Sequence, residues 1–290
     1  MQHEAVVRNV QDGAGPPPDG ARTTVAIHLA DPTRQHEGDL AQAWRVLNTE
    51  ERSRALGFQL EPDRRIYVVA HALLRYVVAG QIGADAGDLR FCRTHHGRPE
   101  LEGRGGADGV HANVNVNVNV RFNLSHTRGL VGCAVTRAGE VGFDVEEARQ
   151  PAPLELAPRY FSRAELDDLK AAPPAERSDR FYTLWTLKEA YIKARGLGLA
   201  IPLESFSCIP GSRGRAHLAR ERPHDGVEDL LAGRSDGGAD DDAAPWTLRW
   251  WRFDRHAAAL AIHAPGVQVR VAIAADVRIE ALAGHRGNRG

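Results

Sequence analysis

Hydrophobic positions recur with a period near 3.6 residues in two early segments, which predicts two helices. The first covers residues 39–57 and the second covers residues 62–79. Pro62 opens the second segment, where its missing N–H costs nothing, and Gly80 follows the segment as a stop signal. We expect most apolar positions of the second helix to pack in the core. These positions are Ile66, Val69, Leu73, Leu74 and Val77.

The same helical spacing returns at residues 154–170 and 178–195. Ser162 and Glu165 are three residues apart, which is the pattern of a capping box, so the first of these helices is expected to restart at Ser162. Gly196 follows the second helix, at the position where left-handed caps are common. The second half of the chain therefore predicts a broken helix followed by a long one.

Alternation of apolar and polar residues with period two predicts strands in two groups. The first group predicts an antiparallel meander and comprises residues 121–124, 130–136 and 141–146. The second group is expected to complete a sheet and comprises residues 246–253, 257–263 and 267–273. Helices and strands in this mixed order predict an α+β fold.

Some segments are rich in Gly, Pro, Asp or Asn and have too little apolar content to form a core. They are a disordered tail at residues 1–22, a low-complexity insertion at about 103–120, a mobile loop at about 211–244 and a tail at 284–290. The remainder is expected to form an N-terminal subdomain, residues 23–140, and a C-terminal subdomain, residues 141–283. A weak sequence echo between the starts of the two long helices is consistent with duplicated halves.

Composition narrows the class of protein. The 290-residue chain is 42% hydrophobic and has no run near the roughly 20 apolar residues that span a bilayer, so we expect no membrane partner. The first 22 residues do not have the pattern of a secretory signal, which favours the cytoplasm. A formal net charge of −1 argues against a nucleic-acid partner. Three widely spaced cysteines argue against a disulfide framework.

Lysine is rare in this chain. Of 37 basic residues, only Lys170, Lys188 and Lys193 are lysines. Two of them fall within residues 185–193, although arginine would serve for ordinary surface charge. This placement indicates a site that needs a compact ammonium group, with chance as the alternative.

Two carboxylates share one face of a predicted strand. Asp144 and Glu146 are alternate residues, so both side chains project to the same side. Hard oxygen ligands of this kind suit Mg²⁺. Gly142, on the same face, removes a side chain where a ligand could approach closely. The alternative is the polar outer face of a half-buried strand.

Trp185, Glu189 and Lys193 are spaced four apart, which places them on one flank of a predicted helix. The alternative is an ordinary solvated Glu–Lys pair. However, the neighbouring positions are mostly apolar, so the two charges would be largely buried and would need partners. A metal ion with phosphate groups would supply these partners.

Other polar residues give weaker signals. Ser125 and His126 are adjacent at a strand end and point to opposite faces, so they cannot form a serine–histidine catalytic pair. His126 is then either structural or ligand-binding. Cys92, His95 and His96 have no fourth ligand nearby for a zinc site.

Four motifs stand in order along the chain. They are Phe122-Asn-Leu-Ser-His126, Val141-Gly-Phe-Asp-Val-Glu146, Phe161-Ser-Arg-Ala-Glu165 and Trp185-Thr-Leu-Lys-Glu-Ala-Tyr-Ile-Lys193-Ala-Arg-Gly196. Together they resemble the 4′-phosphopantetheinyl transferases of the larger, surfactin-synthetase-activating type. The resemblance covers about residues 40–210.

This resemblance implies two similar α/β subdomains related by a pseudo-twofold axis, with coenzyme A in the cleft between them, in a monomer. It implies transfer of 4′-phosphopantetheine from coenzyme A to a serine of an apo acyl or peptidyl carrier protein. That is the reaction of a holo-(acyl carrier protein) synthase, and it releases adenosine 3′,5′-bisphosphate. A catalytically inactive regulator that binds coenzyme A is the alternative.

The resemblance also implies roles for particular residues. Asp144, Glu146 and Glu189 would hold Mg²⁺, and Glu189, Lys193 and Asp144 would be catalytic. The implied coenzyme A contacts are Arg64, Arg75, Arg98, Ser125, His126, Lys188 and Lys193. Ile66 stands where many relatives have a coenzyme-binding arginine, so Arg64 or Arg65 is expected to substitute.

A carrier-docking surface is expected just after the carboxylate strand. The segment Arg149 to Arg163 holds Leu154, Leu156 and Tyr160 among arginines, which would suit an acidic, partly apolar partner helix. The alternative is an ordinary amphipathic helix whose apolar side chains all belong to the core.

Overall fold

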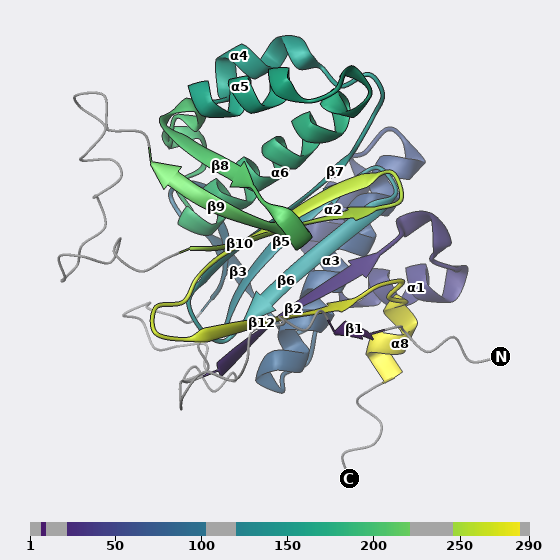
Figure 1. Cartoon of the computed structure of the whole chain (residues 1–290). Helices are drawn as coiled ribbons and strands as arrows, with labels where there is room; N and C mark the ends of the chain where they lie inside the picture. Colours follow the sequence, from purple (N-terminus) through teal and green to yellow (C-terminus); the bar gives the residue numbers. More distant parts are fainter. Residues whose placement is uncertain (1–6, 10–21, 103–119, 221–245, 285–290) are drawn as a thin grey trace. The chain divides into compact units, whose positions relative to one another are not determined.

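The computed structural model describes residues 7–9, 22–102, 120–220 and 246–284 (Figure 1). The chain forms two compact units. The first comprises Met1–Thr94, Pro99–Ala138 and Val267–Gly290, and the second comprises His95–Arg98 and Gly139–Gly266. The chain thus returns to the first unit at Val267, whereas the sequence predicted a single cut at residue 140. Within the predicted disordered tail at 1–22, residues 7–9 form a short strand and Arg22 begins the next one, which corrects the prediction there. The rest of that tail, residues 285–290 of the second tail and residues 103–119 of the insertion lie outside the described residues.

The first unit is built on a five-stranded sheet in the order β1-β12-β2-β6-β5. These strands are β1 (Val7–Asn9), β12 (Gln268–Ala274), β2 (Arg22–Ala30), β6 (Leu130–Thr136) and β5 (Arg121–Thr127). β12 runs parallel to β2, and the other neighbours are antiparallel. β12 therefore belongs to this sheet. The sequence had predicted that it joins the other late strands, and that prediction is wrong.

Helices α1 (Glu37–Val46), α2 (Thr49–Leu56), α3 (Glu61–Ile82) and α8 (Ile279–Gly284) complete the first unit, with a small hairpin of β3 (Phe91–Arg93) and β4 (Pro99–Leu101). The predicted helix at 39–57 is two helices, because Asn48 caps α2 in a reciprocal capping box with Glu51. α3 runs through Gly80 and ends at Gly83, whose φ of 72° is left-handed. α3 packs against β5, β6 and β2.

The second unit has its own antiparallel sheet in the order β7-β11-β10-β9-β8. Its strands are β7 (Glu140–Glu147), β8 (Phe206–Pro210), β9 (Arg215–Arg220), β10 (Thr247–Phe253) and β11 (His256–His263). β7 pairs with β11 and not with β6, so the predicted meander ends after β6. β9 lies inside the loop predicted to be mobile, residues 211–244, so the start of that segment is a strand. Residues 221–245 lie outside the described part.

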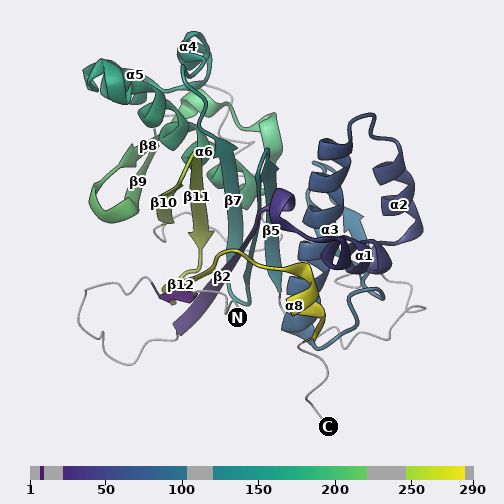
Figure 2. The same cartoon turned by 90° about the vertical axis from the view of Figure 1, so that its right-hand side faces the viewer.

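Among the described residues of this unit, three α-helices accompany the sheet: α4 (Ala157–Tyr160), α5 (Arg163–Ala171) and α6 (Arg177–Arg195). The predicted capping box is present, since Ser162 and Glu165 cap α5 reciprocally. Gly196 ends α6 with a left-handed φ of 68°. α6 packs across β7 and β11 (Figure 2). Short 3₁₀ turns lie at Pro32–Arg34, Leu154–Leu156, Pro174–Glu176, Gly198–Ala200, Leu203–Ser205 and Ser212–Gly214.

Among the described helices, none is long and apolar enough to cross a membrane.

Candidate functional site

The contact between α6 and β7 depends on Gly142. A Cβ atom at this position would overlap the backbone of α6, at the carbonyl oxygen of Ala190 and the amide nitrogen of Ala194. Only glycine lets the helix lie this close to the strand. The sequence predicted that Gly142 makes room for a ligand; the structure shows that the helix backbone takes that room. The glycine therefore positions the helix.

Charged side chains of α6 line up with those of β7. Four residues of helix advance about 6 Å, and two residues of strand advance nearly the same distance. Trp185, Glu189 and Lys193 can therefore follow alternate residues of the strand. At one end Trp185 lies near Glu146 and lowers its pKa, and at the other Lys193 Nζ lies 2.5 Å from Asp144 Oδ1.

The charges of Asp144, Glu146, Glu189 and Lys193 act on one another. Asp144 is only 3% exposed. Burial raises the pKa of Glu146 to about 7, with the Asp144 charge adding to the rise and Lys193 opposing it. Burial, followed by the Asp144 charge, also raises the pKa of Glu189, again against Lys193. Three carboxylates facing one lysine leave an excess of negative charge that a bound cation would offset.

The donor chemistry of these carboxylates fits Mg²⁺, which favours hard oxygen ligands. Across the described ranges, no three His, Cys, Asp or Glu side chains are gathered closely enough to hold a metal ion. Mg²⁺ in proteins commonly takes one or two carboxylates and completes its shell with water and phosphate oxygens. The same absence of a three-ligand group among the described residues includes Cys92, His95 and His96, which do not form a metal site.

Arg98 lies in the same unit, at the C-terminal end of α6. Its Nη1 atom lies 2.8 Å from Glu140 Oε2 and donates to the carbonyl oxygen of Ala194 at 3.1 Å. Gly196 accommodates the Arg98 side chain, because a Cβ atom there would lie 3.1 Å from Nη1. Arg98 is thus held next to the helix turn that carries Lys193.

Lys188 is placed differently from the prediction. Its side chain is fully buried, and Nζ lies 2.5 Å from Glu165 Oε2. A fully buried ammonium cannot contact a phosphate group in this arrangement. The structure therefore separates Lys188 from Lys193, although the two lysines lie in one motif.

Arg75 also differs from its predicted role. It is fully buried in the first unit, where it donates to Glu51 Oε2 at 2.8 Å and to the carbonyl oxygens of Ala86 and Leu89. Its guanidinium group links α3 to α2 and to the loop after α3. This is a structural role, and it leaves no surface of Arg75 for coenzyme A.

Arg64 and Arg65 are distinguished by their partners. Arg65 donates to the backbone carbonyl oxygens of Pro32 and Gln35. Within the described residues, the half-buried side chain of Arg64 has no hydrogen bond or ion pair. Of the two candidates for the role expected at Ile66, Arg64 is therefore the one available to a ligand.

Ser125 and His126 end β5 in the first unit. Ser125 is buried and His126 is exposed, so the strand presents the two side chains differently, as the alternation predicted. His126 is thus accessible to a ligand within its unit.

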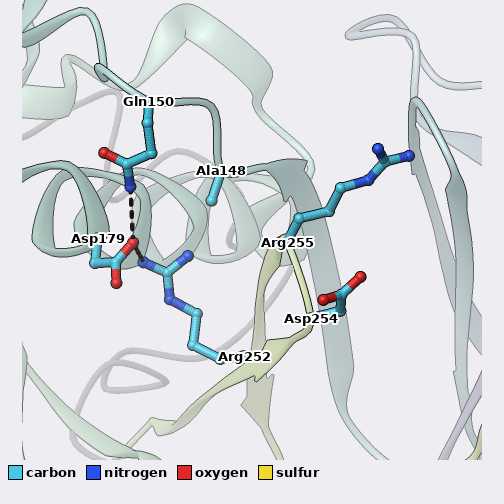
Figure 3. Close-up of a pocket in the computed structure, with 6 residues that line it drawn as sticks. All are labelled: Ala148, Gln150, Asp179, Arg252, Asp254 and Arg255. Atoms are coloured by element: carbon cyan, nitrogen blue, oxygen red, sulfur yellow. Dashed lines mark hydrogen bonds and ion pairs between the residues drawn. The ribbon is translucent and has the colours of Figure 1, made fainter.

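A pocket of about 360 Å³ opens beyond the end of β7 (Figure 3). Arg252 Nη2 lies 2.7 Å from Asp179 Oδ1, and Gln150 Nε2 donates to the same oxygen atom at 3.3 Å. Ala148, Asp254 and Arg255 complete the lining. Sequence reasoning missed this pocket, because its residues come from the loop after β7, the start of α6, strand β10 and the β10–β11 turn, and no motif links them.

Comparisons with known proteins found one family profile that matches within each unit. A profile described as the 4′-phosphopantetheinyl transferase superfamily matches residues 140–250, and one described as 4′-phosphopantetheinyl transferase, N-terminal, matches residues 31–138. The chain is 32% identical to the 4′-phosphopantetheinyl transferase Sfp of Bacillus subtilis over 62% of its own length and 73% of that protein.

Two further similarities were found. The chain is 32% identical to the 4′-phosphopantetheinyl transferase HetI of a Nostoc species, over 63% of the chain and 74% of the relative. A solved holo-(acyl-carrier-protein) synthase from Thermotoga maritima is 22% identical, with a TM-score of 0.33, over 44% of this chain and 64% of that one.

Proposed function

The chain belongs to the 4′-phosphopantetheinyl transferase superfamily and is a 4′-phosphopantetheinyl transferase, and we propose that it transfers phosphopantetheine from coenzyme A to a serine of an apo carrier protein. The observation that carries the proposal is the alignment of α6 with β7. It brings Asp144 to Lys193 and Glu146 to Trp185, inside the segment that the superfamily profile matches.

Coenzyme A would be bound by residues of both units. Lys193 and Arg98 in the second unit, and Arg64, Ser125 and His126 in the first, are the proposed contacts. Arginine and lysine suit phosphate groups, Arg through a planar fork and Lys as a compact charge. The expected pseudo-twofold relation of the halves, and a cleft between them, belong to this proposal.

Asp144, Glu146 and Glu189 would hold Mg²⁺, one or two of them as direct ligands and the others through bound water. When bound, the ion would supply charge neutralisation at the pyrophosphate of coenzyme A. The raised pKa values of Glu146 and Glu189 support this assignment, because burial and the Asp144 charge raise them by more than Lys193 lowers them. Binding of a divalent cation would relieve the repulsion between them.

In the proposed reaction, the serine oxygen of the carrier attacks the β-phosphorus of coenzyme A in line. The P–O bond to adenosine 3′,5′-bisphosphate breaks, and this group leaves. Glu189 accepts the serine proton, directly or through a water molecule. Lys193 orients Asp144 and offsets charge on the phosphate. Positioning and electrostatic stabilisation are expected to supply most of the rate enhancement.

The test is incubation of the protein with coenzyme A, Mg²⁺ and an apo carrier, followed by intact mass measurement of the carrier. A gain of one phosphopantetheine is the expected result. Coenzyme A binding without any mass gain, over a panel of carriers, would instead fit the inactive regulator. We also propose a monomer acting in the cytoplasm, which size-exclusion chromatography and cell fractionation can check.

A further inference from the structure

A buried ion pair connects two of the sequence motifs. Lys188 of the α6 motif and Glu165 of the Phe-Ser-x-x-Glu motif lie 2.5 Å apart, with side chains 0% and 1% exposed. Lys188 Nζ also donates to the carbonyl oxygen of Phe206 at 2.7 Å and lies 4.2 Å from the centroid of its ring. The ammonium is therefore enclosed by one carboxylate, one carbonyl and one aromatic face.

Both carboxylate oxygens of Glu165 also have hydrogen-bond donors. Its Oε2 atom accepts from the amide of Ser162 at 2.9 Å, and its Oε1 atom accepts from the amide of Cys208 at 2.7 Å. The Ser162 hydroxyl lies 2.7 Å from that of Ser207. One carboxylate thus connects the start of α5, strand β8 and the middle of α6.

Such a network tolerates little rearrangement. A buried ion pair repays its desolvation cost only if its geometry and remaining hydrogen bonds are good. A change of one residue in the register of α6 would turn its side chains by about 100°. That turn would leave the Lys188 ammonium and the Glu165 carboxylate buried without partners. The pair therefore specifies the rotation of the helix about its own axis.

This rotation decides where the adjacent residue points. Glu189 follows Lys188 directly, and Lys193 lies four residues further along the flank that meets Asp144. We propose that Lys188 and Glu165 are positioning residues, which set the rotation of α6 so that Glu189 and Lys193 face β7. The inference rests on the proposed function, because the two residues are proposed to orient the side chains of that site and not to bind phosphate.

Amine labelling of the native protein tests the placement of Lys188 directly. The chain has three lysines, so an amine-reactive ester followed by peptide mass mapping reports each one separately. Lys170 is exposed and serves as the internal control. We expect Lys188 to remain unlabelled with and without coenzyme A. Labelling of Lys188 at the rate of Lys170, or its protection by coenzyme A, would overturn the inference.

The same experiment separates this inference from the proposed function. Lys193 is 29% exposed at its side chain and is expected to label slowly, with protection by coenzyme A. If coenzyme A failed to protect Lys193 while Lys188 stayed unlabelled, the phosphate assignment would fall and the burial of Lys188 would stand. This arm uses the wild-type protein and does not depend on any variant folding.

Kinetics of Lys188→Met, Glu165→Gln and the double variant test the positioning role. Each single variant should lower kcat by about 100-fold, as expected when reacting groups are misplaced by about 1 Å. The KM for coenzyme A should stay within about twofold, because neither residue touches it. Glu176→Gln, an exposed carboxylate next to α6, is the matched control and should leave both constants unchanged.

The double variant gives the decisive comparison. Two members of one pair act as a unit, so Lys188→Met combined with Glu165→Gln should be no more impaired than the worse single variant. A phosphate-binding lysine would instead raise the KM for coenzyme A on its own and combine multiplicatively with Glu165→Gln. That second pattern would refute the positioning role.

Discussion

Asp144 combines burial, charge and a bond to Lys193, so it offers the sharpest test at the scale of one residue. Asp144→Ala is expected to lower kcat by at least about 100-fold, because the proposed Mg²⁺ site would lose a carboxylate ligand and Lys193 would lose its partner. Carrier mass gain over time measures the rate, and a circular dichroism melt checks the fold. Near-normal turnover at saturating Mg²⁺ would contradict the metal assignment.

The side-chain placements inferred from the sequence agree with the structure where geometry follows from spacing, while the roles of these residues stay predictions. Alternation placed Asp144 and Glu146 on one face, and spacing of four placed Trp185, Glu189 and Lys193 on one flank; the contacts between the two groups agree with both. Spacing could not reveal that Lys188 pairs with Glu165. That contact depends on how α5 and β8 pack around α6, which no local pattern encodes.

Elements were predicted well where local signals decide them. The capping box at Ser162 and the stop at Gly196 act within one helical turn, and the structure shows both. The failures concern long-range pairing. β7 joins β11 and β12 joins β2, although chain order suggested a meander and a continuous late sheet. Strand partners are chosen by packing across the whole unit, so alternation alone could not identify them.

Gly142 gives a prediction at the scale of an element pair. Gly142→Ala should force α6 away from β7 and destabilise the protein by about 1–3 kcal/mol, the usual cost of overpacking. Transfer activity should fall as well, since Lys193 loses its register with Asp144. Denaturant unfolding and the carrier assay measure the two effects.

The control for this substitution is Gly80→Ala in α3. Nothing lies within 4 Å of a Cβ atom at Gly80, which is exposed in a helix interior. Alanine there should stabilise the protein by about 0.5–1 kcal/mol through its better helix propensity. Equal behaviour of the two variants would show that the Gly142 contact is unimportant.

At the scale of the whole molecule, acid stability should depend on Glu51. Burial would raise its pKa, but hydrogen bonds from His71, Arg75 and the Asn48 amide prevail and lower it from 4.5 to about 2. The stabilisation is therefore complete above about pH 4.5 and is lost as the pH falls towards 2.

Glu51→Gln should lower the free energy of unfolding at pH 7 by roughly 3 kcal/mol, because buried Arg75 loses its charged partner. The decline of stability between pH 5 and pH 2 should also become shallower. Urea titrations at several pH values measure both effects. An unchanged pH dependence would show that Glu51 has an ordinary pKa in the folded protein.

Carrier recognition is also a property of the whole molecule. In the segment Arg149 to Arg163, Leu156 is 39% exposed and Arg159 and Arg163 are exposed, while Tyr160 packs against Trp185. Arg159→Glu with Arg163→Glu is expected to raise the KM for an acidic carrier about tenfold and to weaken its salt dependence. Coenzyme A affinity should not change.

A matched charge reversal controls for net charge. Arg45→Glu with Arg90→Glu changes two exposed arginines of the first unit by the same four charges. This variant should leave the KM for the carrier near the wild-type value. If both double variants raised it equally, docking would depend on overall charge and not on the segment after β7.

The order of strands also bears on synthesis at the ribosome. β12 pairs with β2, although all of the second unit lies between them in the chain. The whole second unit is therefore synthesised before β12. Until β12 emerges, β2 has only β6 beside it, and one of its edges stays open. Such an edge in a nascent chain is a site where chaperones bind or neighbouring chains mispair.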